Sequence, residues 1–389
     1  MKLRQKGTAV THHDIIPATP AEALRTDRGE GPVLLFAPNV LQAMARRFQD
    51  GFDGLVTYAV KANDAEDVIT NLSSAGIRAF DVASPAEMAA VRRIVPDAVL
   101  HYNNPVRTVR EIEAGMAVGV ASWAVDSQAE FAKIAARVPA EGTEIAVRFK
   151  LPVPGAAYDF GEKFGATPQE AGELLRAVAA AGFIPAMTFH PGTQCPDGAA
   201  WAAYIEAAAR IADAAGVRLA RLNVGGGFPA RRMDADAAAL EAIFDTIGAS
   251  LHAAFATPPA LVCEPGRAMV AECQALLSRV KAVRASGAVF LDDGVYGGLA
   301  EHLVMGVSDR IRVLDPAGRP RSGAPVPRTV FGPSCDSLDR LPGDVPLPAD
   351  TAEGDAVIFL GMGAYGLVTS TRFNGYGALR QLTVHDLTM

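Results

Sequence analysis

The sequence predicts an α/β fold: a (β/α)₈ TIM barrel with a second, all-β domain of sandwich or barrel type. Three observations lead to it. From residue 33 to about residue 267, short apolar stretches of strand type alternate with alanine-rich segments of helical period. After Arg267 the helical period nearly disappears, and short strands separated by proline and glycine follow. Polar residues and glycines stand where the early strands end, the edge at which such a barrel places its active site.

The barrel prediction depends on a repeated strand–helix unit. Continuous apolar strands separated by amphipathic helices are typical of a parallel sheet with helical crossovers. The expected strands are Val33–Ala37, Leu55–Val60, Ile77–Val82, Ala98–Tyr102, Val120–Val125, Glu144–Phe149, Ile184–His190, Arg218–Val224 and Ala260–Glu264. The expected helices include Asn39–Phe48, Ala65–Ala75, Pro85–Ile94, Asp126–Arg137, Pro168–Ala181, Ala199–Ala215 and Ala235–Phe255. Eight or nine such units favour a closed barrel over an open sheet.

The last third of the chain predicts the β domain. Its expected strands are Val280–Val283, Ala288–Leu291, Ile311–Val313, Thr329–Phe331, Ala356–Leu360 and Leu379–Val384. The proline-rich stretches Leu314–Pro327 and Leu341–Asp350 are expected to be loops. We therefore divide the chain into an N-terminal segment that joins the β domain (1–30), the barrel (31–267) and the β domain (268–389).

Composition excludes several classes of protein. The chain has 389 residues, of which 50% are hydrophobic and 20% charged, as in ordinary globular enzymes. A net charge of -7 gives no reason to expect nucleic acid or an anionic membrane as a partner. No apolar stretch is long enough to span a bilayer, and the N-terminus lacks the apolar core of a signal peptide. The four cysteines show no C-x-x-C spacing, so we expect reduced thiols, no metal and a cytoplasmic location.

Lys61 follows the apolar stretch Leu55–Val60 directly. A lysine in this position is either a surface amine whose stem lies along apolar atoms, or a pocket amine of lowered pKa that forms a Schiff base. The stretch alone does not decide between them. Other polar residues and glycines at strand ends favour the second interpretation: Asp81, Arg148, His190, the run Gly225–Gly227 and Glu264.

Three of these strand ends each allow a structural and a functional interpretation. The run Gly225–Gly227 is either a flexible turn or a backbone cradle for an anion. Glu264 and Arg267, three residues apart, form either a surface ion pair or a pair of contacts to a ring nitrogen and a phosphate. His190 either makes a structural hydrogen bond or stacks on a planar ring, while Thr193 binds phosphate.

Eight motifs in order carry a resemblance to a known family: YAVKAN, FDVAS, HPGTQ, GGGFP, CEPGR, DDGVYGG, GPSCDSLD and GAYG. Together they resemble the fold-type III pyridoxal-phosphate decarboxylases, most of all the ornithine/lysine decarboxylase branch, related to diaminopimelate decarboxylase. The resemblance extends from about Val33 to Gly375. It implies an amino acid carboxy-lyase that uses pyridoxal 5'-phosphate.

The resemblance also implies roles for individual residues. Lys61 would hold the cofactor covalently, His190 would stack on its ring, and Glu264 would pair with the ring nitrogen. Cys335 would protonate the substrate carbon after carbon dioxide leaves. The implied cofactor-binding set is Lys61, Asp81, Arg148, His190, Thr193, Gly226, Gly227, Glu264, Gly266, Arg267 and Tyr365. The implied substrate contacts are Asp336, which would bind a distal ammonium, together with Asp309, Tyr296 and Phe373.

The resemblance further implies a homodimer with shared active sites. In the family, the loop that matches Cys335 and Asp336 enters the partner subunit's site. Lys163 and Asp339 resemble a pair that bridges the two subunits. Two departures concern the cofactor turn, where Pro191 and Thr193 stand in place of the usual valine and serine; threonine keeps the hydroxyl.

The substrate is expected to be a basic diamino acid, ornithine or lysine, which would give a polyamine precursor. The family's second acidic substrate contact is not clear here: Asp309 and Glu301 are candidates, but Arg310 and Arg312 stand beside Asp309. This leaves open a substrate with a distal carboxylate, meso-diaminopimelate or a carboxylated siderophore intermediate.

Two other classes of protein compete with this interpretation. An alanine-racemase-like enzyme shares the barrel and the lysine but places arginine, not a carboxylate such as Glu264, on the ring nitrogen. A non-catalytic binding homologue could lose Lys61 or Cys335, and both are present.

Overall fold

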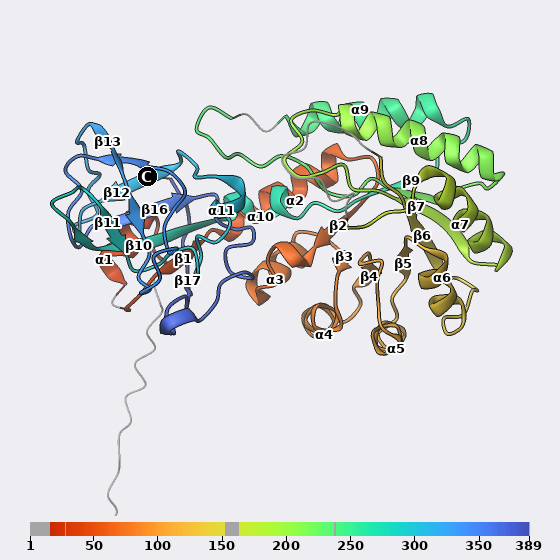
Figure 1. Ribbon diagram of the computed structural model, residues 1–389, viewed down its shortest axis with the longest axis horizontal. Coiled ribbons are helices and arrows are strands. Elements are labelled where there is room, and N and C mark those ends of the chain that lie inside the picture. The colour runs from red at the N-terminus through yellow and green to blue at the C-terminus, as the bar shows by residue number, and fades with distance from the viewer. Residues whose placement is uncertain (1–15, 28, 152–162, 237–238, 389) are drawn as a thin grey trace, which may run out of the picture.

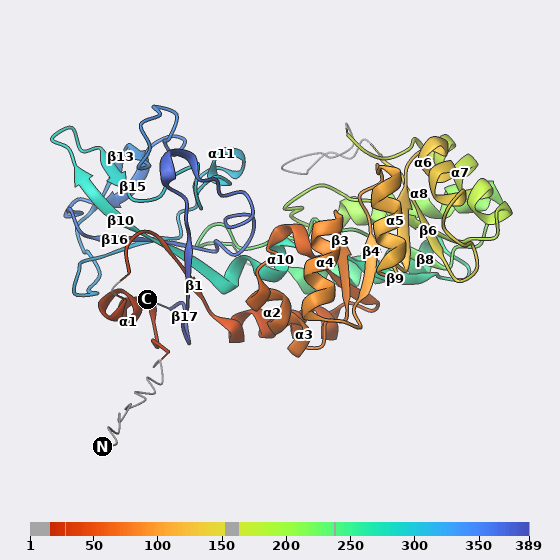
Figure 2. The same cartoon turned by 90° about the horizontal axis from the view of Figure 1, so that it is seen from below.

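The computed structural model describes residues 16–27, 29–151, 163–236 and 239–388. Two domains lie side by side along the long axis of the molecule (Figure 1), and the view turned by 90° separates them equally well (Figure 2). One is a barrel wrapped in helices, and the other is built mainly of strands. The predicted fold class is therefore confirmed.

The barrel consists of eight parallel strands, and β2 pairs with β9 to close it. In order these strands are β2 (Leu55–Ala59), β3 (Ala79–Val82), β4 (Val99–Tyr102), β5 (Ser122–Val125), β6 (Glu144–Arg148), β7 (Ile184–Thr188), β8 (Arg221–Asn223) and β9 (Ala260–Cys263). The outer helices are α2 (Pro38–Gly51), α3 (Glu66–Ser74), α4 (Pro85–Ile94), α5 (Val109–Ala117), α6 (Gln128–Ala135), α7 (Pro168–Ala180), α8 (Ala199–Ala215) and α9 (Leu240–Ala254).

Local sequence signals explain where these helices begin. Thr108 and Thr167 each form a capping box with a glutamate three residues later, and Ser84 caps α4 in front of its first-turn proline. The strands are apolar on both faces because helices cover one face and barrel side chains fill the other. Trp123 and Trp201 are among the largest side chains that are fully buried in the resulting core.

The β domain contains a seven-stranded, mostly antiparallel sheet of order β12-β16-β10-β1-β17, with β11 beside β10 and β14 beside β11. Its strands are β1 (Val33–Phe36), β10 (Gln274–Val283), β11 (Val289–Leu291), β12 (Ile311–Leu314), β14 (Val330–Phe331), β16 (Ala356–Leu360) and β17 (Arg380–Thr383). The short helix α1 (Pro20–Thr26) packs against this sheet through Ala23 and Leu24.

The strand β1 corrects the sequence-based assignment. We expected residues from 31 onward, including Val33–Ala37, to belong to the barrel, but β1 pairs with β10 and β17 in the β domain. Its four residues are all buried, so their composition fits either sheet equally well. The other predicted domain boundaries stay predictions.

The two proline-rich stretches are not wholly loops, as we had expected. The first overlaps β13 (Pro325–Arg328) and the second contains β15 (Val345–Pro348), and these two strands form a two-stranded antiparallel sheet. Prolines stand at every second position and face one another, Pro325 against Pro348 and Pro327 against Pro346. Prolines at this spacing all fall on the side of the strand where no ladder hydrogen bond is needed, so the pairing survives the missing N–H groups.

Buried hydrogen bonds join the two domains beside Lys61. Tyr365 N–H donates to the Ala62 carbonyl at 2.8 Å, and Asn63 Nδ2 donates to the Gly363 carbonyl at 2.8 Å. The chain also passes directly from β9 through α10 (Arg267–Val270) into β10. The β domain therefore forms part of the wall at the carboxyl ends of the barrel strands. In the described residues, no helix combines the length and the apolar character needed to cross a membrane.

Candidate active site

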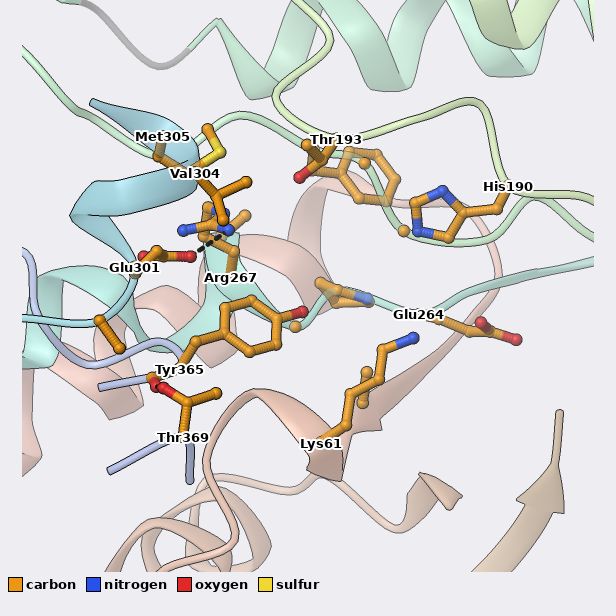
Figure 3. Close-up of a pocket in the computed structure, with 18 residues that line it drawn as sticks. Lys61, His190, Thr193, Glu264, Arg267, Glu301, Val304, Met305, Tyr365 and Thr369 are labelled. Atoms are coloured by element: carbon orange, nitrogen blue, oxygen red, sulfur yellow. Dashed lines mark hydrogen bonds and ion pairs between the residues drawn. The ribbon is translucent and has the colours of Figure 1, made fainter. Parts of the chain in front are cut away.

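A cavity of about 500 Å³ opens at the carboxyl ends of the barrel strands, next to the β domain. We call it the main cavity. A smaller cavity of about 190 Å³ shares Lys61, His190 and Glu264 with it. Figure 3 shows Lys61 and His190 on opposite sides of the main cavity, with Glu264 toward one end and Arg267 and Glu301 toward the other. The residues that line it include Lys61, His190, Thr193, Gly226, Gly227, Glu264, Gly266, Arg267, Glu301, Val304, Met305, Tyr365 and Thr369.

Lys61 lies in a single 3-10 turn, Val60–Ala62, that ends β2. Its side chain is exposed to the cavity but is enclosed by surrounding protein. Burial disfavours the charged ammonium, but the negative charges of Asp81 and Glu264 outweigh it and hold the pKa of Lys61 above its ordinary value. The expected lowering of this pKa is therefore wrong for the protein alone. The amine is a cation between carboxylates rather than an isolated buried base.

His190 follows β7 and is neutral. Burial and the nearby charges of Lys61 and Arg148 hold the pKa of His190 well below its ordinary value. Its Nδ1 accepts a hydrogen bond from Gly192 N–H at 3.2 Å, which fixes the orientation of the ring. A neutral, oriented imidazole that faces the cavity is suited to packing against a planar ligand.

The run Gly225–Gly227 forms a tightly packed cradle rather than a flexible turn. Gly225 and Gly227 have φ values of 69° and 89°. A Cβ atom at Gly226 would lie 2.8 Å from the Glu264 carbonyl oxygen, and one at Gly227 would lie 2.7 Å from the carbonyl oxygen of Gly192. Only glycine fits, so the backbone itself can approach a ligand. This geometry favours the anion-cradle interpretation of the run.

Glu264 is buried, with 8% of its surface exposed. Its Oε1 accepts hydrogen bonds from the side-chain amides of Asn103 and Asn223. Burial and the charge of Asp81 raise the pKa of Glu264, while Lys61, Asn223 and Arg148 oppose the shift. Burial likewise raises the pKa of Asp81, against the charge of Lys61 and hydrogen bonds from Asn103. The carboxylates of Glu264 and Asp81 and the cations Lys61 and Arg148 form a nearly balanced set.

Arg267 does not pair with Glu264, so the alternative of a surface ion pair between them is excluded. Arg267 instead forms an ion pair with Glu301, and both side chains are 11% exposed. Its guanidinium lies 5.0 Å from the centroid of the Tyr365 ring. The Nε of Arg267 is buried and has no hydrogen-bond partner within the described residues. An arginine N–H without a partner, beside Tyr365 and the glycine cradle, suits an anionic ligand.

Cys335 and Asp336 do not line either cavity of their own chain. They lie in an exposed cluster of the β domain, which we call the loop cluster. Asp336 accepts a hydrogen bond from Tyr296 O–H at 2.6 Å, and the Tyr296 ring lies 4.7 Å from that of Phe373. Cys335 N–H donates to Asn374 Oδ1 at 3.1 Å. Three of the four predicted substrate contacts, Tyr296, Asp336 and Phe373, are therefore neighbours.

The remaining sequence candidates lie elsewhere. Asp309 accepts a hydrogen bond from Asp234 N–H at 2.8 Å and does not line the main cavity, so its substrate role stays a prediction. Asp339, expected to bridge subunits with Lys163, is 1% exposed and accepts hydrogen bonds from Val295 N–H and Ser334 N–H at 2.9 and 3.0 Å. These buried contacts give Asp339 a role within its own subunit.

The sequence interpretation missed Asn103, Asn223, Val304 and Met305. Asn223 is the last residue of β8, and Asn103 directly follows β4. Both obey the strand-end rule that identified the other site residues, so this signal was present. Val304 and Met305 come from α11 (His302–Met305), a single turn that carries no sequence signal of its own.

The residues of the main cavity fit a flat, phosphorylated, amine-reactive cofactor. Lys61 offers an amine, and His190 offers a ring face. The glycine cradle and the unpartnered Nε of Arg267 offer donors to an anion, and Glu264 lies toward the opposite end (Figure 3). The main cavity therefore has a cationic end and a carboxylate end. This arrangement matches a molecule with a phosphate at one end and a ring nitrogen at the other.

Comparisons with known proteins agree with this geometry. Residues 39–271, more than half of the chain, match the family model for the pyridoxal-binding domain of pyridoxal-dependent decarboxylases. A lysine/ornithine decarboxylase from Selenomonas ruminantium is 32% identical, covering 82% of this chain and 81% of that protein. An ornithine decarboxylase from Panagrellus redivivus is 29% identical, covering 92% of this chain and 87% of that protein.

Solved structures show the same relationship. The crystal structure of lysine decarboxylase from Selenomonas ruminantium has a TM-score of 0.80 at 29% identity, covering 92% of this chain and 93% of that chain. The arginine decarboxylase of Paramecium bursaria Chlorella virus, solved with agmatine, has a TM-score of 0.82 at 25% identity, covering 92% and 98%. The chain therefore belongs to the pyridoxal-dependent decarboxylase family, in its ornithine/lysine branch, and is an amino acid decarboxylase whose cofactor is pyridoxal phosphate.

Proposed function

We propose that the chain decarboxylates a basic diamino acid, ornithine or lysine, and so produces a polyamine precursor. The observation that carries the proposal is the state of Asp336. Hydrogen bonds from Leu338 N–H and Tyr296 O–H hold the pKa of Asp336 below its ordinary value, so this half-buried carboxylate is charged at neutral pH. A charged carboxylate favours a substrate with a distal cation. The names of the relatives support this class, since they are decarboxylases of lysine, ornithine or arginine.

A substrate with a distal carboxylate is the second candidate. The reason is the part of the main-cavity wall that α11 forms. This helix presents Val304 and Met305 to the main cavity, and the carboxylate of the residue just before it, Glu301, is paired with Arg267. It therefore offers no unpaired acid to a second amine. Diaminopimelate or a carboxylated siderophore intermediate would meet less repulsion here than at a wall of two free carboxylates.

In the proposed reaction each residue of the chain has a defined task. Lys61 would hold the cofactor covalently, and Thr193, Arg267 and the backbone N–H groups of the glycine cradle would hold its phosphate. When bound, the cofactor would supply an acceptor for the electron pair that remains when the substrate carboxylate leaves as carbon dioxide. His190 packs on the ring, and Glu264 keeps the ring nitrogen protonated. The Cys335 thiol then gives its proton to the substrate carbon.

Cys335 and Asp336 reach the main cavity in this proposal only if a second subunit supplies them. The loop cluster carries exposed apolar side chains, with Leu338 72% and Phe373 42% exposed, as expected of a docking surface. We therefore propose an isologous homodimer in which each site contains one chain's Lys61 and the other chain's Cys335. An exposed free thiol at Cys335 also supports a reducing, cytoplasmic location.

The test of the substrate class is carbon dioxide release from a panel of L-amino acids: ornithine, lysine, arginine and meso-diaminopimelate. The proposal expects kcat/KM for ornithine or lysine to exceed that for diaminopimelate by at least about tenfold, the effect of one charge-assisted contact. Preference for diaminopimelate would replace the first proposal with the second. Release from none of the four would shift the search to larger carboxylated conjugates.

A further inference from the structure

Among the residues that the structure describes, the carboxylate of Glu264 has two hydrogen-bond donors on one oxygen and none on the other. The side-chain Nδ2 groups of Asn103 and Asn223 both donate to Oε1. Within the described residues, no hydrogen bond to Oε2 is found. The three side chains are 5% to 8% exposed, so water does not compete for these contacts. This asymmetry leaves Oε2 available to a ligand.

Asn223 is held in one orientation by the glycine cradle. Its Oδ1 accepts a hydrogen bond from Gly225 N–H at 2.9 Å, so its Nδ2 must face Glu264. Glu264 N–H in turn donates to the Gly225 carbonyl at 2.8 Å. A Cβ atom at Gly225 would lie 2.2 Å from the Phe189 carbonyl oxygen, so the turn has little room to move. Asn223 thus connects the cradle to the carboxylate through a fixed geometry.

Asn103 lies between two carboxylates. It donates to Glu264 Oε1, and its side chain and backbone also help to hold down the pKa of Asp81. Two buried carboxylates close to each other tend to share a proton, because both cannot easily remain ionised. An amide between them supplies a donor that does not titrate, so neither carboxylate needs a proton to satisfy its oxygens.

We propose that Asn103 and Asn223 are positioning residues that stabilise the ionised carboxylate of Glu264 and leave its second oxygen free for the ring nitrogen of the cofactor. This inference deepens the proposed function, because it depends on the pairing of Glu264 with that nitrogen. One proton is shared between the carboxylate and the nitrogen. Each amide donor stabilises the carboxylate and makes it less basic, so the proton stays on the nitrogen. Without the amides the proton moves to Glu264, and the ring nitrogen becomes neutral.

The experiment measures that proton directly. Holoenzyme is prepared with pyridoxal phosphate labelled with ¹⁵N in its ring, and the ¹⁵N chemical shift reports whether the nitrogen carries a proton. The variants are Asn223→Ala, Asn103→Ala and the reference Glu264→Gln. The control is Asn71→Ala, at a half-buried asparagine of α3 that lines neither cavity. In Asn223→Ala and Asn103→Ala we expect the shift to move toward the neutral value and kcat to fall roughly tenfold each, with KM nearly unchanged.

The outcomes separate this inference from the proposed function. If Glu264→Gln leaves the nitrogen protonated, the role proposed for Glu264 is wrong, and this inference fails with it. If Glu264→Gln gives a neutral nitrogen while both asparagine variants keep the wild-type shift, only the inference is overturned. Asn71→Ala should match wild type throughout.

A second variant, Asn223→Asp, preserves the shape of the side chain if Asn223→Ala fails to fold. A neutral aspartic acid can donate an O–H to Glu264, whereas an ionised one cannot. We therefore expect kcat of Asn223→Asp to fall toward high pH along a titration that wild type lacks. A pH profile parallel to that of wild type would contradict a donor role for this residue.

Discussion

The candidate site has two halves, the barrel residues around Lys61 and the loop cluster of the β domain. A single chain assembles the first half, but it leaves the second away from the main cavity. The barrel half, around Lys61 and Glu264, is buried and joined by hydrogen bonds from several strands. The loop cluster of the β domain, with Cys335 and Leu338 on its surface, is exposed and has contacts mainly among its own members. In the proposed homodimer, the barrel of one chain would hold the cofactor, while the partner's loop cluster would supply proton donation and substrate selection.

Replacing Lys61 by alanine should impair the catalytic function of the barrel half of the site most severely. We expect the Lys61→Ala enzyme to lose roughly 10⁴-fold or more in kcat, the scale of losing a covalent catalyst. Bound cofactor should also lose the visible absorbance of its lysine-linked form. Lys281→Ala, in β10, provides a control. Retained lysine-linked absorbance in Lys61→Ala would assign the covalent role to another amine.

Replacing Glu264 by glutamine should leave the cofactor bound but reduce kcat by roughly 10²- to 10³-fold, as when a preorganised electrostatic group is removed. The amide cannot hold the ring nitrogen protonated. Glu144 offers a matched control, because it is also 8% exposed but lies at the opposite end of its barrel strand. The measurement is kcat together with cofactor affinity. Equal losses in Glu264→Gln and Glu144→Gln would point to stability rather than chemistry.

Subunit complementation sharpens the comparison, since it asks whether the loop cluster acts across an interface. Lys61→Ala and Cys335→Ala homodimers should each be nearly inactive. After mixing and exchange, heterodimers with one intact site should restore roughly a quarter of wild-type activity if exchange is random and the sites are independent. Exchange without recovery would place Cys335 in its own chain's chemistry or remove it from the reaction.

Replacing Asp336 by asparagine should have the smallest effect, a rise in KM for a basic substrate of about fivefold, as for an exposed ion pair. Because the pKa of Asp336 is lowered, its carboxylate contributes at neutral pH, and the contribution is lost only as pH falls through that lowered value. The wild-type advantage over Asp336→Asn should therefore shrink only in acid. Asp309→Asn measured in parallel separates the two predicted contacts, and a larger KM change there would reverse their order.

The sequence allowed much of the barrel to be predicted because its strands and helices alternate strongly. The helices Pro85–Ile94 and Ala199–Ala215 have the predicted bounds. Strand β1 was misplaced because a fully buried strand has the same composition in either sheet. The strands β13 and β15 were missed because proline normally marks a loop.

The features of the candidate site also divide into those that local sequence patterns predict and those that they do not. Residues at the carboxyl ends of strands were found because the barrel brings those ends together. The ion pair between Arg267 and Glu301 was not foreseen, because the two residues come from different domains and only tertiary packing joins them. The raised pKa of Lys61 likewise depends on carboxylates from β3 and from the end of β9, the two strands that flank β2 in the closed barrel. Local patterns therefore identify candidates, whereas charge balance requires the fold.

The pairing of β1 with β17 has a consequence for the order in which the protein is made. Val33 lies beside Arg380 in a parallel pair, so nearly the whole chain separates two neighbouring strands. The barrel strands all emerge from the ribosome between these two partners. The barrel can therefore close during synthesis, and β1 can pair with β10, but its second edge must wait for β17. The wall that Tyr365 contributes beside Lys61 is likewise made late, so a cofactor site forms only near the end of translation.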